Sequence, residues 1–171
     1  MDHGFSREQY REAMTRMGTA VNVVTSAGPA GRLGFTASAV CSVSDTPATL
    51  LVCMNRNSAQ NAAIKENGVL CVNTLGAGQE EISAVFAGQT KLRGDARFQV
   101  GLWCVLQTGA PVLSDAAVSF DCLIDQTMEV FTHSVLICRV QAISEGNNPS
   151  GLCYFGRTYH AFPPCRSDPI R

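Results

Sequence analysis

The sequence has little charge and no long hydrophobic run. Asp, Glu, Lys and Arg make up 16% of its residues, whereas about a quarter is typical of a soluble domain. The formal net charge is −1 and the charges form no blocks, so neither nucleic acid nor an anionic membrane surface is expected as a partner. No apolar run approaches the ~20 residues of a membrane helix. The opening residues MDHGFSREQYREAM lack the apolar core of a signal peptide, which predicts a cytoplasmic protein.

Common catalytic and nucleotide-binding motifs are also missing. The segment GPAGRLG has the wrong spacing for a Rossmann fingerprint and does not open a helix, and there is no P-loop. Any nicotinamide must therefore bind without a Rossmann unit. No H-E-x-x-H or G-x-S-x-G motif appears, so nothing supports a hydrolase or a metalloenzyme.

Cysteine is plentiful, but it does not occur in metal-binding or disulfide-framework patterns. No C-x-x-C or C-x-H pair occurs, and most cysteines lie in apolar runs such as LLVCM and VLICRV. Reduced thiols packed as small hydrophobic side chains are favoured over zinc ligands or disulfides, and no metal site is expected. The cysteines are Cys41, Cys53, Cys71, Cys104, Cys122, Cys138, Cys153 and Cys165.

The length and composition indicate one domain, 1–171, that associates with a second copy. A chain of 171 residues falls within the usual single-domain range. Because 46% of the residues are hydrophobic and few are charged, some apolar surface is expected to be hidden in an oligomer, most simply a homodimer.

Three short helices are predicted. Within 1–18, Ser6 and Gln9 form a capping box, Phe5 and Tyr10 can form a hydrophobic staple, and one face is apolar. Its members are Tyr10, Ala13, Met14 and Met17.

The second helix is predicted to start at Asn57, with Gln60 at its third position, and to end at Gly68. The third lies in QEEISAVFAG, with Glu80 and Glu81 in its first turn, and ends at Gly88. Its buried face is expected to comprise Ile82, Val85 and Phe86. Residues 89–115 are expected to form a long connection, partly ordered against a partner chain.

The remaining segments have the composition of strands. We expect 20–26, GFTASAVCSVS and 49–55 to form consecutive strands of an antiparallel meander, followed by 69–75, AVSFDCLI, SVLICRVQAI and GLCYF. In AVSFDCLI, Val118, Phe120, Cys122 and Ile124 alternate with Ser119 and Asp121. Many strands with few helices favour a mainly β fold with a closed barrel over a doubly wound sheet. Residues 162–171 are expected to be a loose tail.

Two polar segments are candidates for ligand binding. GFTASAVCSVSDTP combines Thr36, Ser38, Ser42 and Ser44 with small alanines, which would let a flat ligand approach the backbone. Composition by itself favours an ordinary serine-rich edge strand here. In CMNRNSAQN, Arg56, Asn57 and Ser58 at a helix start suit a phosphate, although ordinary capping with a solvated arginine explains them equally well.

Histidine is scarce, with three in the chain. His133, in FTHSV, and His160, in GRTYHAF, could each donate a hydrogen bond to a cofactor carbonyl or satisfy a loop carbonyl.

Taken together, several segments resemble the flavin reductase family of two-component flavin monooxygenases. They are REAMTRMGTAVNVVTSAGPAG, GFTASAVCSVSDTP, TLLVCMNRNS, GVLCVNTLGAGQEEISAVFAG, AVSFDCLI, THS and GLCYFGRTYH. The resemblance runs from about Phe5 to Ala161 and is closest to the reductases of pyrimidine utilisation and of aromatic hydroxylation. It implies a homodimeric split β-barrel of the FMN-binding type, with one flavin site per subunit near the dimer interface.

The resemblance also implies roles for particular residues. The isoalloxazine edge would be lined by Thr36, Ala37 and Ser38, with Ser42 and Val43 continuing along the flavin. Its phosphate end would be held by Asn55, Arg56 and Ser58, and Phe86 and Gly88 would lie beside the cofactor. The nicotinamide would be faced by His133, Tyr159 and His160, and His133 would act by positioning or polarising.

The activity implied is hydride transfer from NADH to N5 of FAD or FMN, after which reduced flavin leaves for a separate monooxygenase acting on an aromatic compound or a pyrimidine. The sequence departs from the family at Phe131, where glycine is usual, and at Pro47-Ala48, where many members have two prolines. A stiffer loop or a narrower nicotinamide pocket is expected from Phe131. The alternatives are a non-catalytic flavin- or haem-binding barrel and a purely structural or interaction subunit.

Overall fold

Strands are the main secondary structure of the computed structural model, which describes residues 4–147 and 150–164. A seven-stranded antiparallel sheet has the order β3-β2-β6-β9-β10-β5-β4. Its strands are β2 (Asn22–Ser26), β3 (Leu33–Ala37), β4 (Val40–Asp45), β5 (Ala48–Asn55), β6 (Val69–Thr74), β9 (Val118–Val130) and β10 (His133–Glu145). The prediction of a mainly β fold with a few short helices is confirmed.

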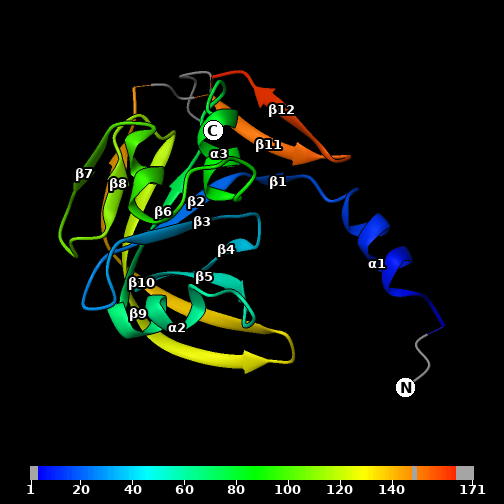
Figure 1. The fold of residues 1–171 in the computed structure, drawn as a ribbon, viewed down its shortest axis with the longest axis horizontal. Helices are drawn as coiled ribbons and strands as arrows, with labels where there is room; N and C mark the ends of the chain where they lie inside the picture. The colour runs from blue at the N-terminus through cyan, green and yellow to red at the C-terminus, as the bar shows by residue number, and fades with distance from the viewer. Residues whose placement is uncertain (1–3, 148–149, 165–171) are drawn as a thin grey trace.

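The seven-stranded sheet closes on itself at the corner between β3 and β4. These strands lie at opposite edges of the sheet, yet only Ser38 and Ala39 separate them in the chain. The amide of Cys53 donates to the carbonyl oxygen of Ala39 over 2.9 Å, which ties the corner to β5. The sheet therefore curls until its edges meet (Figure 1).

The predicted meander is wrong at this corner. GFTASAVCSVS is not one strand, and its two halves pair with different neighbours, β3 with β2 and β4 with β5. The physical reason is that the chain turns a barrel corner at Ser38 and Ala39 instead of reversing in a hairpin.

Two smaller sheets complete the fold. One contains β1 (Thr19–Ala20), β11 (Gly151–Phe155) and β12 (Thr158–Phe162), in that order, and the other contains β7 (Trp103–Val105) and β8 (Pro111–Leu113). A loose tail was expected from residue 162 onward, but Phe162 still belongs to β12. Residues 165–171, which include Cys165, lie outside the described residues.

The connection 89–115 is ordered against its own chain. It contains a 3₁₀ helix, η1 (Gly94–Gln99), and the β7–β8 pair. Phe98 and Trp103 from this segment pack on Phe86, with ring centroids 5.1 and 5.5 Å from it. Aromatic burial within the chain already orders the segment, and its expected contact with a partner chain stays a prediction.

The strand β9 is buried on both faces near its start. Ser119 and Asp121, expected on a polar outer face, are fully buried. Ser119 donates to Oδ1 of Asn73 over 3.0 Å, and the amide of Thr108 donates to Oδ2 of Asp121 over 2.8 Å. The alternation was misleading because the segment around β7 and β8 covers this face.

The helix α1 (Arg7–Met14) stands away from the barrel (Figure 1). Its Ser6–Gln9 capping box is confirmed, and the Phe5 and Tyr10 rings stack with centroids 6.4 Å apart. None of its residues is buried. An ion pair between Glu12 and Arg157, 2.8 Å long, links it to the β11–β12 turn.

The other two helices lie against the sheet. α2 (Asn61–Asn67) begins after Gln60, so the predicted cap at Asn57 is wrong, whereas Gly68 ends the helix at φ 68° as predicted. α3 (Glu80–Phe86) has Glu80 and Glu81 in its first turn and buries Ile82, Val85 and Phe86, as predicted. Within the described residues, no helix is long and apolar enough to cross a membrane.

Candidate functional site

Two hollows meet along the end of β3, and we take them together as the candidate site. The first, of about 330 Å³, runs from this strand end toward β5. It is lined by Phe35, Thr36, Ala37, Ser38, Ala39, Cys53, Met54, Asn55 and Ser58. The second, of about 210 Å³, runs toward α3 and β12. It is lined by Val21, Thr36, Ala37, Ser38, Ser83, Ala87, Gln89, Tyr154 and Tyr159.

The shared wall of the two hollows is Thr36, Ala37 and Ser38, the residues predicted for the isoalloxazine edge. Ala37 is the last residue of β3, and the corner that follows exposes Ser38. The Thr36 hydroxyl donates to the carbonyl oxygen of Ser83 over 2.7 Å. Small side chains at the end of the strand leave room for a flat ligand close to the backbone.

Phe86 supports this wall from behind. It is 2% exposed and packs against Phe98 and Trp103. A Cβ atom added to Gly34 would lie 2.9 Å from the Phe86 ring, so the glycine lets β3 rest directly on this ring. The placement of Phe86 beside the cofactor is therefore not supported, because its ring is in the core. Gly88, at φ 76°, lies between Ala87 and Gln89, which line the second hollow.

Ser42 and Val43 are not part of either hollow. Ser42 lines a separate hollow of about 330 Å³, whose further members include Val40, Phe120 and Ile143. Val43 is 51% exposed. The physical reason is the corner at Ser38 and Ala39, which takes β4 to the opposite sheet edge.

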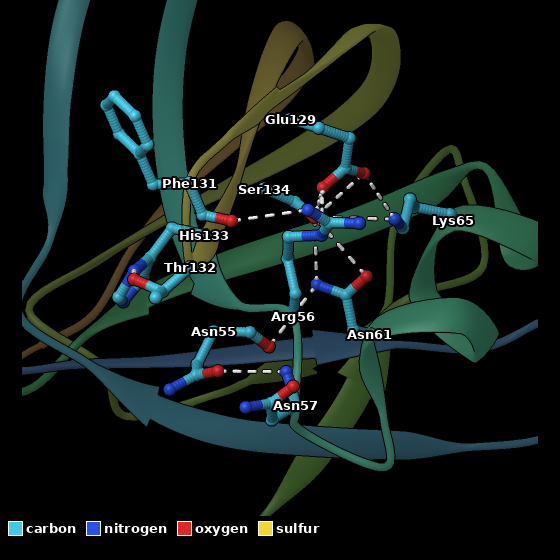
Figure 2. Close-up of polar contacts among 10 residues, drawn as sticks. All are labelled: Asn55, Arg56, Asn57, Asn61, Lys65, Glu129, Phe131, Thr132, His133 and Ser134. Carbon is cyan, nitrogen blue, oxygen red and sulfur yellow. Dashed lines mark hydrogen bonds and ion pairs between the residues drawn. The ribbon is translucent and has the colours of Figure 1, made fainter.

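At the far end of the first hollow, Asn55 and Ser58 lie in its wall, but Arg56 does not. The Arg56 guanidinium is turned toward the tip of the β9–β10 hairpin, with Nε 2.8 Å from Oε2 of Glu129 (Figure 2). Nη1 of Arg56 also donates to the carbonyl oxygen of Phe131 over 3.2 Å.

The anion site predicted from amides at a helix start does not form. The Arg56 amide donates to the Thr132 carbonyl over 2.9 Å, that of Asn57 to Oδ1 of Asn55 over 2.8 Å, and that of Ser58 to the Asn55 carbonyl over 3.1 Å. These amides are occupied because α2 begins only at Asn61, so the segment before it forms turns.

Glu129 is the centre of a charged cluster that also includes Arg56, Lys65, Asn61 and Ser134 (Figure 2). Nζ of Lys65 lies 2.7 Å from Oε1 of Glu129, and the Ser134 hydroxyl donates to Oε2 over 3.0 Å. The hydrogen bonds from Lys65 and Ser134, together with the charges of Lys65 and Arg56, hold the pKa of Glu129 below its ordinary value of 4.5. Arg56 and Lys65 each carry a positive charge and Glu129 carries one negative charge, so these three side chains leave one net positive charge near the first hollow.

The residues predicted to face the nicotinamide are divided between two sheets. His133 begins β10 opposite Asn55 of β5, is exposed, and has Nδ1 2.9 Å from the Thr132 hydroxyl. Tyr159 on β12 lines the second hollow. His160 lines neither hollow, and its Nε2 lies 3.2 Å from the carbonyl oxygen of Phe155. Within one chain, only Tyr159 of this group belongs to the candidate site.

Several residues of the site were not predicted. They are Val21, Phe35, Ala39, Cys53, Met54, Ser83, Ala87, Gln89 and Tyr154. Gln89 follows the FAG segment and Tyr154 lies shortly before the GRTYH segment. Closeness in the sequence to predicted site residues is the only feature that could have indicated these two. No sequence feature indicates Ser83 as a site residue, because a single serine in an amphipathic helix forms no distinctive pattern.

The cysteines behave mainly as core side chains. Cys71, Cys122 and Cys138 are fully buried, and burial raises the pKa of the Cys138 thiol to about 12. Among the described residues, no group of three or more His, Cys, Asp or Glu side chains could hold a metal ion.

The combined hollows fit a flat ligand with a polar tail. Alanines and the hydroxyls of Thr36 and Ser38 line the middle, and Asn55 and Ser58 provide polar groups at one end. Apolar walls with a few polar groups are typical of cofactor pockets, and a flavin has this shape and polarity.

Comparison with known proteins decides the family. Residues 14–163 match the family described as Flavin reductase like domain. The chain belongs to this family. A relative from Ancylobacter novellus named FMN reductase (NADH) RutF is 56% identical over 156 residues, covering 91% of this chain and 85% of its own. The RutF protein of Escherichia coli K12 is 52% identical over 161 residues, covering 93% and 97%.

Solved structures agree with this family membership. Streptomyces globisporus NADH:FAD oxidoreductase SgcE6, in complex with NAD and FAD fragments, superimposes with a TM-score of 0.84 at 26% identity, covering 95% of this chain and 96% of that one. The flavin reductase PheA2 has a TM-score of 0.82 at 28% identity, with 91% and 97% covered. The flavin reductase fold expected from the sequence segments is thereby confirmed.

Proposed function

We propose that this protein is an NADH-dependent flavin reductase that reduces FMN and releases it for a separate monooxygenase. The observation that carries the proposal is the wall Thr36–Ser38 shared by two adjoining hollows, because hydride transfer requires two flat rings to lie against each other. The names of the RutF relatives favour FMN over FAD as the flavin and NADH as the reductant. The resemblance of the sequence segments points to oxidation of a pyrimidine or an aromatic compound as the reaction of the partner monooxygenase.

In this proposal the chain binds and orients, and the bound flavin supplies the redox chemistry by accepting hydride. Thr36, Ala37 and Ser38 lie along the ring edge, and Asn55 and Ser58 meet the phosphate end. Tyr159 borders the nicotinamide. Arg56 contributes to phosphate binding only if its guanidinium leaves Glu129 and binds the phosphate instead. His133 lies opposite Asn55, at the same phosphate end of the first hollow.

We also propose that the protein is a homodimer and works in the cytoplasm. The hollow bordered by Ser42, Ile143 and Phe120 is largely apolar and open in a single chain, which supports coverage by a second copy. Ser42, Val43 and His160 could then reach a flavin only from the partner subunit. A reducing cytoplasm suits a chain whose described cysteines are free thiols, four of them buried.

Turnover assays test the proposed activity. Purified protein is mixed with NADH and FMN, with NADH and FAD, or with NADH and no flavin, and the loss of NADH is followed. We expect fast consumption with excess FMN and slower consumption with FAD. A rate with FMN that does not exceed the protein-free blank would refute the reductase.

A non-catalytic flavin- or haem-binding barrel is the alternative, because related split barrels have such roles, and an obstruction of the nicotinamide pocket by Phe131 would favour it. The Phe131 side chain is 92% exposed at the hairpin tip and lines neither hollow. It points away from the Glu129 cluster (Figure 2). Within its own chain Phe131 therefore does not obstruct either hollow, and it gives no support to this alternative.

A further inference from the structure

We infer that Ser83 is a positioning residue that holds Tyr159 against the second hollow and thereby sets the affinity for the nicotinamide substrate. The inference rests on the proposed reductase function, and it assigns a role to a residue that no sequence motif indicated.

Ser83 connects two walls of the second hollow. It lies in α3, is fully buried, and its hydroxyl oxygen is 2.9 Å from the Tyr159 hydroxyl on β12. Its carbonyl oxygen accepts the Thr36 hydroxyl of β3 over 2.7 Å and the Ala87 amide of the helix over 2.8 Å. One residue thus meets both the ring wall and the nicotinamide wall.

The Tyr159 hydroxyl is the hydrogen-bond partner that the buried Ser83 hydroxyl needs. A buried hydroxyl without a partner is costly, and serine is a weaker helix former than alanine. Alanine would therefore suit this helical position better if the side chain had no further role. The tyrosine ring is held on its other side by Tyr154, in an edge contact with centroids 5.3 Å apart.

The two bonds of Ser83 can be separated by mutation. Ser83→Ala removes the side-chain bond to Tyr159 but keeps the backbone carbonyl that accepts Thr36. The ring wall should therefore stay in place while Tyr159 is released. Tyr159→Phe removes the same bond from the opposite side and leaves the aromatic ring.

The test is a double-mutant cycle measured with full-length wild-type protein, Ser83→Ala, Tyr159→Phe and the double variant. At saturating FMN, we expect each single variant to raise the KM for NADH roughly fivefold, the factor that corresponds to one net hydrogen bond. The double variant should show no further rise, because both changes remove one shared bond. The kcat should change less than twofold, and the dissociation constant for FMN, measured by quenching of its fluorescence, should not change.

Ser119→Ala is the matched control, since it removes another fully buried serine hydroxyl, bonded to Asn73 away from both hollows. It should lower the melting temperature without changing the KM for NADH. Additive effects in the cycle, or an unchanged KM in Ser83→Ala, would overturn the inference while leaving wild-type turnover intact. If Ser83→Ala does not fold, an unchanged KM in Tyr159→Phe overturns it equally. Absence of wild-type turnover overturns the proposed function itself, and this inference with it.

Discussion

Phe131 adopts a backbone conformation that suits glycine. It is the first residue of the two-residue turn between β9 and β10, and its φ is +50°. A positive φ at the first turn position is characteristic of a type II′ turn, where glycine is favoured. This explains why glycine is usual at this position in the family that the sequence resembles.

Phe131→Gly should therefore stabilise the protein. Holding a residue with a side chain at a positive φ costs about 1–2 kcal/mol, which glycine avoids, and the added freedom of glycine in the unfolded chain offsets about 0.4–1 kcal/mol of this gain. We expect the free energy of unfolding in urea to rise by about 0.5–1 kcal/mol. Thr132→Gly is the control, because the next position has no positive φ, and it should destabilise. A loss of stability in Phe131→Gly would contradict the strain argument.

His133→Ala tests the histidine at the hairpin. The resemblance gives His133 a role facing the nicotinamide, so we expect a fall in the NADH-dependent rate, and its place opposite Asn55 at the phosphate end predicts a modest loss of FMN affinity. Steady-state kinetics and FMN titration measure both quantities. His160→Ala is the comparison for a residue that lies outside both hollows of its own chain and could reach a flavin only from the partner subunit. Unchanged kinetics in His133→Ala would remove this residue from the site.

At the scale of elements, β3 is positioned by its contact with α3. Gly34 has no side chain to separate the strand from Phe86, and a Cβ atom there would also lie 3.0 Å from the Val24 carbonyl oxygen. The glycine of GFTAS and the phenylalanine of FAG thus form one packing unit that supports the shared wall of the hollows.

Gly34→Ala should separate these elements. Overpacking of this kind costs about 1–3 kcal/mol, and we expect a lower melting temperature together with weaker FMN binding, since the strand end at Thr36 and Ala37 must shift. Gly18→Ala is the control, because a Cβ atom there would meet Cys153 at an ordinary 3.5 Å. Equal melting temperatures for the two variants would contradict the argument.

The tip of the β9–β10 hairpin is fastened to α2 by Glu129. Because its pKa is lowered in the folded protein, the carboxylate contributes stability above its ordinary value of 4.5, and this contribution is lost as the pH falls through the lowered pKa. The partners that face it are Arg56, Lys65 and Ser134.

Glu129→Gln should therefore be less stable than the wild type at neutral pH. The difference in melting temperature should stay constant down to about pH 4.5 and shrink below it. Thermal unfolding of both proteins across this range measures the effect. A difference that persists unchanged in acid would show that the ion pairs do not stabilise the hairpin.

At the scale of the whole molecule, the exposed apolar surface predicts the subunit contact. Val43 and Ile143, more than half exposed, lie on β4 and β10, two of the strands that border the apolar hollow lined by Ser42. Ile143→Glu should convert a dimer into a monomer in light scattering after size exclusion. Leu102→Glu, at an even more exposed residue outside that hollow, should remain dimeric. A wild-type monomer would refute the dimer.

The elements of this protein could be predicted wherever a local pattern specified them. The capping box at Ser6, the end of α2 at Gly68 and the buried face of α3 each depend on residues within a few turns of one another. Ser119 and Asp121 were misread because alternation reports one buried face and cannot reveal a second layer of the same chain.

The sequence by itself determined the family and the strand-rich composition, because these are carried by short contiguous patterns, and the role of Thr36–Ser38 as the ligand wall stays a prediction from the resemblance. Only the tertiary structure decided that Arg56 meets Glu129, that His133 and Tyr159 belong to different sheets, and that Ser83 meets Tyr159, 76 positions away. Such contacts depend on strand register and on how the sheet closes. No local pattern encodes either, since both result from packing between distant parts of the chain.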